Sequence, residues 1–444
     1  MITLTLILAV TFIVLLSLPR RSSRDEVARF HGGIESLEPR IAPAALVAKF
    51  AGGTLTVTGD AATNVVKLQG AGASVEVFDG MTSLGIFAGV KNIVAKLDGG
   101  TTATANFLGG GIAGSVTVVE NGPSSFTIGA SSAIGGALAV TGDGLAQTFS
   151  VGDNVTVGKA LTFAGGLGAD SFTIGNNVSI GGNATFSGAE SGIFNVTNVT
   201  TISGSLAFKN AATPLAVMIS TAGAAGLNVT GKVSYAGGLS DDNLFLGGTF
   251  SAGATFADLK GNNGFGLAAG SIVHGSISMT TGAGNDSINI QSGTVDKDVT
   301  LKLGSGNNAF RYGIAGSVTI SGNLSFTGGA GDDLWQSFGG GMTLGKNLTL
   351  QFGDGMNTAT AGVTVGGTKV SITTGSGTDS ISIDGSALNA AVVVSLGAGT
   401  DSLGGVLMNH PLSAKYDGGA GVDHFVENSL TANPAILIGF EDFS

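Results

Sequence analysis

A short glycine-rich turn recurs along most of the sequence at a nearly constant interval. Turns of the form Gly-x-Gly-x-Asp, with the related turns at 238–242 and 304–308, lie at residues 166–170, 282–286, 329–333, 375–379, 397–401 and 419–423. We call the last residue of each turn the marker. The markers of the final three turns, Asp379, Asp401 and Asp423, are each 22 residues apart. Self-similarity at a period of this length is typical of solenoid folds, in which each repeat packs only against its neighbours.

The residue two positions after the marker is usually large and apolar. This first column contains Phe126, Phe149, Phe172, Phe194, Leu244, Phe265, Ile288, Phe310, Trp335, Ile381, Leu403 and Phe425. The residue between marker and column is usually small or polar, which is the alternation of a strand with one buried face. A second column, about seven residues before the marker, contains Phe163, Tyr235, Met279, Phe326, Ile372 and Tyr416. Alternating segments such as 317–320, with Val318 and Ile320 facing inward, supply a third strand.

Three short strands in each period of about 22 residues, with no helix between them, predict an all-β fold. The expected architecture is a parallel β-helix, or β-solenoid, because one coil cannot bury its own apolar residues whereas a stack of coils can. The predicted regions are an export signal or anchor with a short motif at 1–45, a β-rich cap at 46–110, solenoid repeats at 111–427 and a carboxy-terminal cap at 428–444.

The composition excludes several kinds of function. Only 11% of residues are charged, the net charge is −11, and Arg311 is the only arginine after Arg40. Because phosphate binding depends on clustered Lys and Arg, we expect no nucleic-acid partner. The absence of cysteine excludes disulfides and thiolate chemistry. The four histidines make no pair at metal-ligand spacing.

The amino-terminal segment carries the localisation signal. Residues 2–18 form an almost unbroken apolar run, which Pro19 ends and Arg20 and Arg21 follow. Such a run is an export signal or a membrane anchor. Its positive charge lies after the apolar stretch, the reverse of an ordinary signal peptide, so a misassigned start codon is an open alternative. We expect contact with a membrane only through this segment.

Residues 34–44, Ile-Glu-Ser-Leu-Glu-Pro-Arg-Ile-Ala-Pro-Ala, add a second signal. They resemble the LEPR-type amino-terminal segment found at the start of large exported and surface proteins of some bacteria. In that family a basic stretch precedes the Leu-Glu-Pro-Arg core, and Arg20, Arg21, Arg24 and Arg29 fit such a stretch. The apolar run upstream departs from the family pattern. The resemblance implies a secreted or cell-surface protein.

The turns at 328–335 and 418–425 resemble the nonapeptide of haemolysin-type (RTX-like) calcium-binding repeats, which form β-solenoids. In that family the glycine turn supplies carbonyl oxygens and the aspartate supplies a carboxylate. Oxygen ligands of this kind suit calcium. The resemblance implies calcium as a cofactor, with the metal-site residues Asp332, Asp333, Asp379, Asp401 and Asp423.

Stacking also places like charges at ~5 Å in successive coils, which repel unless a cation lies between them or they face water. A different interpretation of the turn is purely structural. Asn263, Asn308, Asn357 and Gly192 occupy marker positions without a carboxylate. Asn, Gly and Asp all favour tight turns, so turn geometry alone would explain the pattern. The calcium-binding family also runs its nonapeptides in tandem, whereas here one turn occurs in each coil.

These features favour a non-catalytic structural or adhesive protein, with glycans or other cell-surface components as partners. The alternative is a polysaccharide-degrading β-helix enzyme, a lyase or hydrolase. The adjacent acid pairs of the repeats are Asp241 with Asp242 and Asp332 with Asp333. Neighbouring residues of a strand face opposite ways, so neither pair is expected to act as a general acid and base. We therefore expect no catalytic residues.

Overall fold

The second of two compact units of the chain, residues 43–444, contains every residue with a described structure; the first is residues 1–42. The described residues contain strands but no helix, and therefore no helix that is long and apolar enough to span a membrane. The predicted export signal or anchor and the LEPR-type segment lie outside them. The computed structural model describes residues 46–59, 64–71, 74–107, 111–166, 168–188, 193–196, 199–209, 216–219, 226–258, 260–383, 387–405, 413–427 and 436–443.

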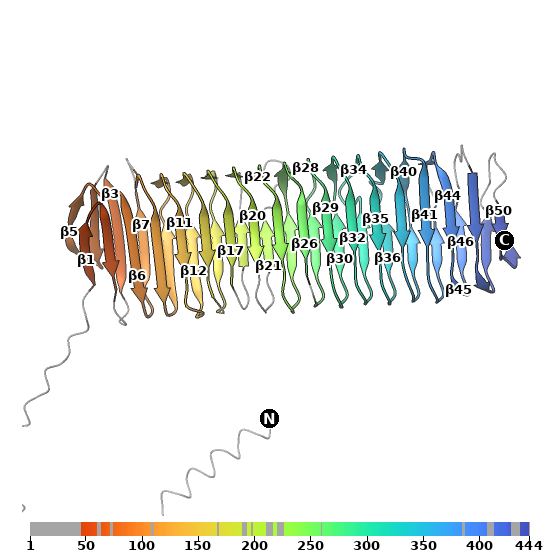
Figure 1. The fold of residues 1–444 in the computed structure, drawn as a ribbon, viewed down its shortest axis with the longest axis horizontal. Coiled ribbons are helices and arrows are strands. Elements are labelled where there is room, and N and C mark those ends of the chain that lie inside the picture. The colour runs from red at the N-terminus through yellow and green to blue at the C-terminus, as the bar shows by residue number, and fades with distance from the viewer. Residues whose placement is uncertain are drawn as a thin grey trace, which may run out of the picture. The chain divides into compact units, whose positions relative to one another are not determined.

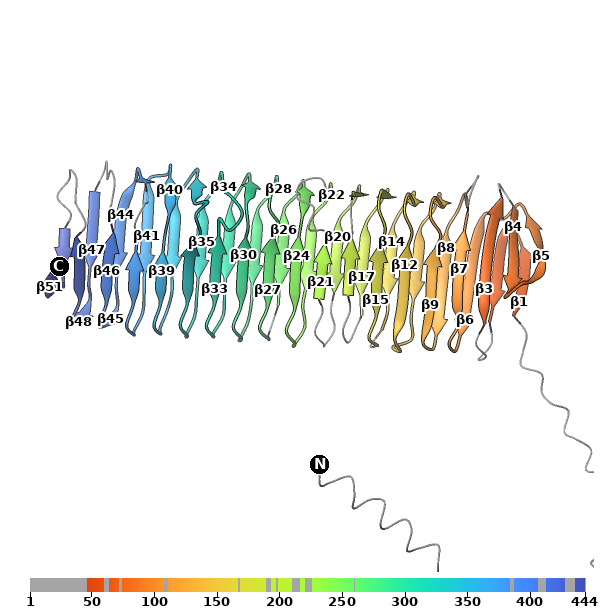
Figure 2. The same cartoon turned by 180° about the vertical axis from the view of Figure 1, so that it is seen from behind.

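The second unit is a parallel β-solenoid of about 13 turns, which confirms the predicted fold class. From β10 to β46 each coil contributes one strand to each of three sheets, and each of these strands pairs in parallel with its equivalent one coil away. Figures 1 and 2 show the strands side by side along the solenoid, from β1 and β5 at one end to β50 and β51 at the other.

Three sheets, named A, B and C here, contain nearly all strands. Sheet A consists of β1 (Val47–Ala51), β2 (Thr54–Thr58), β6 (Asn92–Asp98), β8 (Val116–Asn121), β11 (Leu138–Thr141), β14 (Leu161–Ala164), β17 (Ala184–Ser187), β20 (Leu206–Lys209), β23 (Val233–Ala236), β26 (Ala254–Ala257), β29 (Ile277–Thr280), β32 (Val299–Lys302), β35 (Leu324–Thr327), β38 (Leu348–Gln351), β41 (Lys369–Thr373), β44 (Ala391–Ser395), β47 (Ser413–Asp417) and β50 (Ile436–Ile438). Sheet B consists of β3 (Val65–Ala71), β4 (Ser74–Asp79), β5 (Thr82–Ala88), β7 (Thr102–Asn106), β9 (Ser124–Ile128), β12 (Gln147–Val151), β15 (Ser171–Ile174), β18 (Ile193–Val196), β21 (Ala216–Ile219), β24 (Asn243–Leu246), β27 (Gly264–Leu267), β30 (Ser287–Ile290), β33 (Ala309–Tyr312), β36 (Leu334–Ser337), β39 (Thr358–Thr360), β42 (Ser380–Ser382), β46 (Ser402–Gly405), β49 (His424–Glu427) and β51 (Asp442–Phe443).

Sheet C consists of β10 (Ala133–Ile134), β13 (Thr156–Val157), β16 (Val178–Ile180), β19 (Thr200–Ile202), β22 (Leu227–Val229), β25 (Gly248–Phe250), β28 (Ser271–Val273), β31 (Gly293–Val295), β34 (Val318–Ile320), β37 (Met342–Leu344), β40 (Val363–Val365) and β43 (Ala387–Leu388). The remaining strands, β45 (Ala398–Gly399) and β48 (Ala420–Gly421), pair within the glycine turns.

The strand register places the predicted columns in continuous rows. In sheet B, Phe149 pairs with Phe172, and in sheet A, Phe163 pairs with Phe186. The ring centroids of Phe310 and Trp335 are 4.5 Å apart, and those of Tyr235 and Phe256 are 4.8 Å apart. Aromatic pairs at such distances add about 0.5–1.5 kcal/mol each beyond the burial of their area. The rows therefore fix the register as well as filling the interior.

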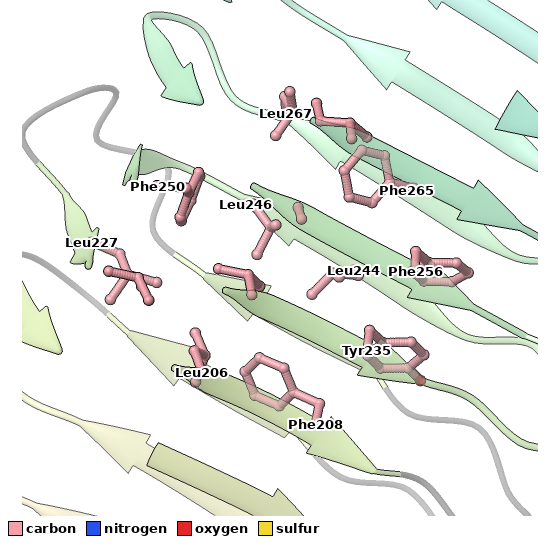
Figure 3. Close-up of a cluster of buried hydrophobic side chains, with 14 of the residues drawn as sticks. Leu206, Phe208, Leu227, Tyr235, Leu244, Leu246, Phe250, Phe256, Phe265 and Leu267 are labelled. Atoms are coloured by element: carbon pink, nitrogen blue, oxygen red, sulfur yellow. The ribbon is translucent and has the colours of Figure 1, made fainter. Parts of the chain in front are cut away.

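The interior contains almost only apolar side chains, and Figure 3 shows this packing for neighbouring coils. Leu244 and Phe265 come from sheet B, Tyr235 from sheet A and Phe250 from sheet C, and all four are buried. The alternation of a strand places every second residue in this interior. The intervening residues face outward, and most of the buried polar groups lie in the turns, although Glu120 of β8 and Gln147 of β12 are buried within strands.

The two ends differ from the middle. Strands β1 and β2 pair antiparallel, as do β3, β4 and β5, and this hairpin structure covers the first coil. At the other end β50 pairs in parallel with β47, and β51 with β49, so the tail continues the sheets. Strands β6 and β7, within the predicted cap at 46–110, already pair in parallel with β8 and β9.

Candidate metal site in the stacked turns

The marker side chains form a buried ladder along one corner of the solenoid. The N–H of Asp379 donates to Oδ1 of Asp401 at 2.8 Å, and the N–H of Asp401 donates to Oδ1 of Asp423 at 2.9 Å. Asp423 in turn donates its N–H to Oε2 of Glu441 at 2.9 Å. Equivalent bonds of 2.8–3.1 Å join Asp242, Asn263, Asp286, Asn308, Asp333, Asn357 and Asp379 in sequence. Each coil thus receives a side-chain acceptor from the coil that follows it.

A second ladder runs beside the first in the opposite direction. It uses the residue immediately before the marker: Oδ1 of Asp241 accepts the N–H of Asn262 at 2.7 Å, and Oδ1 of Asn262 accepts the N–H of Asn285 at 2.8 Å. Asn285, Asn307 and Asp332 continue this outer ladder to the N–H of Met356. A pair of adjacent Asp or Asn residues therefore ties its coil to both neighbours.

Asparagine and aspartate differ in what their second side-chain atom does in the inner ladder. Nδ2 of Asn308 donates to the carbonyls of Gly304 and Gly306 at 3.1 and 2.9 Å. It also donates to Oδ1 of Asp333 at 3.0 Å. Nδ2 of Asn357 makes the same three kinds of bond, to its own turn and to the next marker. An ionised aspartate has no hydrogen to offer at this position.

In four of the five predicted metal residues the second carboxylate oxygen is correspondingly unpaired. Oδ2 of Asp333, Asp379, Asp401 and Asp423 is buried and has no hydrogen-bond partner in the described structure. Each of these side chains is at most 1% exposed. At Gly328, a Cβ atom would collide with Oδ2 of Asp333, so this oxygen points back toward the start of its own turn. The missing side chain of that glycine makes room for the carboxylate.

Burial raises the pKa of several of these carboxyl groups. It raises the pKa of Asp333 to about 6. It raises the pKa of Asp401 to about 6 as well, and the adjacent charges of Asp379 and Asp423 act in the same direction. Near the other end of the solenoid, burial raises the pKa of Asp170 to about 6 and that of Glu120 to about 7. These carboxyl groups therefore take up a proton at a higher pH than carboxyl groups of ordinary peptides do.

The structure brings together three of the five predicted metal residues. Asp379, Asp401 and Asp423 occupy successive rungs of the inner ladder, and Asp333 lies on the same ladder two rungs before Asp379. Asp332 belongs to the outer ladder, where Oδ1 accepts the N–H of Met356 at 2.7 Å. Asp332 and Asp333 are therefore separated although they are adjacent in sequence.

The donor set fits calcium only in part. The unpaired Oδ2 atoms are hard oxygen donors, which calcium prefers, but a complete shell needs six to eight oxygens. No three acidic or histidine side chains among the described residues converge into a group that could hold a metal ion. Backbone carbonyls of the glycine turns would have to supply most of the shell. Calcium binding therefore stays a prediction.

The sequence indicates the outer ladder at a position that the marker pattern leaves out, the residue immediately before the marker. In consecutive coils the residue before the marker is Asp241, Asn262, Asn285, Asn307 or Asp332, a conspicuous run of Asp and Asn. Glu441, which closes the inner ladder, had no such signal because it lies in the tail and outside the repeat.

The paired ladders and stacked apolar rows define the class of the protein as a parallel β-solenoid with side-chain ladders in its turns. Comparisons of the chain with models of protein families, with curated proteins and with solved structures found no match.

Substitution of Asp401 separates the acceptor role of the ladder from its charge. In calcium-free buffer at pH 7.5, Asp401→Ala leaves the buried N–H of Asp379 unpaired and should lower the free energy of unfolding by about 1–3 kcal/mol. Asp401→Asn keeps the acceptor and removes a charge between two carboxylates, so we expect its stability to equal or exceed that of the wild type. Thermal and urea unfolding measure both. The matched reverse change, Asn357→Asp, should destabilise; equal losses for Asp401→Asn and Asp401→Ala would contradict this account.

The raised pKa values of Glu120 and Asp170 predict an unusual pH dependence. Between about pH 4 and pH 7 the folded protein binds more protons than the unfolded chain, so the free energy of unfolding rises as pH falls from 7.5 to 5. We expect the melting temperature in chelator to rise by a few degrees over this range, and Glu120→Gln to reduce the rise. A melting temperature that falls steadily from pH 7.5 to 5 would contradict the prediction.

Proposed function

We propose that this chain is a non-catalytic, secreted or cell-surface protein with a structural or adhesive role, stabilised by calcium. The observation that carries the proposal is the continuous β-solenoid. In its described ladders, the aspartates accept hydrogen bonds from neighbouring coils and so hold the coils together. A rigid scaffold with repeated lateral faces suits a structural or adhesive function. The LEPR-type segment at 34–44 supports the location.

The adjacent acid pairs favour this proposal over a polysaccharide-degrading enzyme. Asp242 is buried and belongs to the inner ladder, whereas Asp241 accepts the N–H of Asn262 on the outer ladder. Asp333 and Asp332 are divided in the same way. A general acid and base must both reach one substrate bond, and two side chains committed to opposite ladders are poorly placed to do so.

Localisation is tested by fractionating the native cell with an antibody against residues 111–427. We expect the protein in the medium or on the surface, where protease added to intact cells removes it. A cytoplasmic marker protein that survives the same treatment is the control. Recovery of the protein inside intact, protease-treated cells would contradict the proposal.

The calcium component predicts a metal-dependent melting curve at constant pH. A site that binds only the folded chain stabilises it by about 2.7 kcal/mol at a free calcium concentration 100-fold above its dissociation constant. We expect calcium to raise the melting temperature relative to chelator, and Asp401→Asn to reduce the rise. Magnesium at equal ionic strength is the control. Identical melting curves with calcium and with chelator would remove calcium from the proposal.

A further inference from the structure

The outer face of sheet B contains a cleft that no turn or ladder explains. Its walls come from β24, β27 and β30, which lie side by side, and from the residues that follow β30 and β33. The volume is about 200 Å³, and the lining includes Phe245, Gly266, Asn289, Gln291 and Ile314. Sites of roughly 300–1,000 Å³ hold drug-sized ligands, so this cleft suits a smaller unit such as one ring of a longer chain.

An outward-facing aromatic ring forms one wall. Leu244 and Leu246 of β24 point into the core, so Phe245 between them faces out and is only partly buried. Its ring lies against Gly266 of the next coil, where a Cβ atom would collide with the ring. Gly266 is buried beneath this ring although its position in the strand faces outward. The glycine thus allows the ring to lie along the sheet.

Glycine also occupies the other outward position of β27. A Cβ atom on Gly264 would collide with Oδ1 of Asn243, so the amide of Asn243 lies over this residue. Among the described sheet B strands from β24 to β42, β27 alone has glycine at both outward positions. This local change of sequence creates the cleft in an otherwise regular face.

Amide groups surround the ring. Oε1 of Gln291 accepts the N–H of Ala269 at 3.2 Å, which fixes the side chain and leaves Nε2 as its donor. Nδ2 of Asn289 donates to Oγ of Ser287 at 3.3 Å, and its Oδ1 is an acceptor. Carboxamides can both donate to and accept from hydroxyl groups, whereas the face of an aromatic ring attracts the slightly positive C–H groups of a ligand. A sugar ring presents both kinds of group.

The charge of this face is unusual for so acidic a chain. Arg311 of β33 follows Asn289 in the same outward row, and its Nη1 donates to Oγ of Ser287 at 3.3 Å. From β24 to β42 the outward residues of the described sheet B strands include no carboxylate, and Arg311 is their only charged residue. Of the nearest ladder acids, Asp242 and Asp286 are buried in the preceding turns, and Asp241 is exposed but accepts the N–H of Asn262. Along this outward row, the positive charge of Arg311 therefore attracts an anionic group of a ligand.

We propose that this cleft binds a segment of an acidic polysaccharide, with one sugar ring on Phe245, its hydroxyl groups on the amides of Asn243, Asn289 and Gln291, and a carboxylate at Arg311. Phe245 and Arg311 are three coils apart, or about 14 Å at ~4.8 Å per coil, so the segment spans a few sugar residues along the rod. The inference rests on the proposed surface function and names its partner by chemical class.

Affinity electrophoresis of the full chain in gels containing polygalacturonate, or neutral dextran, tests this proposal. We expect retardation by polygalacturonate only. Phe245→Ala should weaken it at least tenfold, and Gly266→Ala should weaken it by displacing the ring while keeping every polar group. Arg311→Gln should weaken it and reduce its dependence on salt. Phe338→Ala, which removes another exposed phenylalanine outside the cleft, is the matched control and should bind as the wild type does.

Phe245, Gly266 and Arg311 do not belong to the hydrophobic core, so we expect the variants to melt at the temperature of the wild type. This measurement shows that each variant folds. Absence of retardation by polygalacturonate overturns the proposal, as does full retention by Phe245→Ala or equal retardation by dextran. None of these outcomes contradicts the proposed surface location, because cell fractionation tests the location independently. Recovery inside the cell would remove the proposed function even if the purified chain bound the polymer.

Discussion

Every coil of this protein depends on hydrogen bonds to the coils above and below it, including at the corners where the chain turns. Sheets satisfy the backbone in the strands, but a glycine turn leaves N–H groups that need another acceptor. The two ladders supply it, with Asp or Asn at the marker facing one neighbour and the residue before it facing the other. Without cysteine, the stack has no covalent cross-link to replace these bonds.

Aspartate and asparagine share the acceptor role but not the electrostatic cost. From Asp242 to Asp379 the inner ladder alternates strictly between the two, so each Asn separates two carboxyl groups and donates to one of them. At Asp379, Asp401 and Asp423 the alternation ends and three acids are stacked. Protons, a cation or both must offset the repulsion there, because buried like charges are costly.

The fold was predictable because the period of the sequence equals the period of the stack. Phe172, Phe310 and Phe425 fall in one row of sheet B, as their spacing indicated. The ladders were less predictable, because spacing alone does not reveal whether a side chain reaches forward or back along the stack. Asp332 and Asp333 are the clearest case: as neighbours they were expected to face opposite ways, but the sequence did not show that each joins a separate ladder. The cleft at Phe245 escaped prediction because it depends on two glycines of the next coil, whose positions the repeat pattern did not single out.

The alternation in the inner ladder also limits how such a chain can lengthen. Duplicating one coil between Asp242 and Asp379 would put two aspartates or two asparagines on adjoining rungs, whereas duplicating two coils together preserves the order. The smallest addition that leaves the electrostatics of this corner unchanged is therefore a tandem pair. The stacked apolar rows would accept a single added coil, but the inner ladder in this stretch keeps its order only when coils are added two at a time.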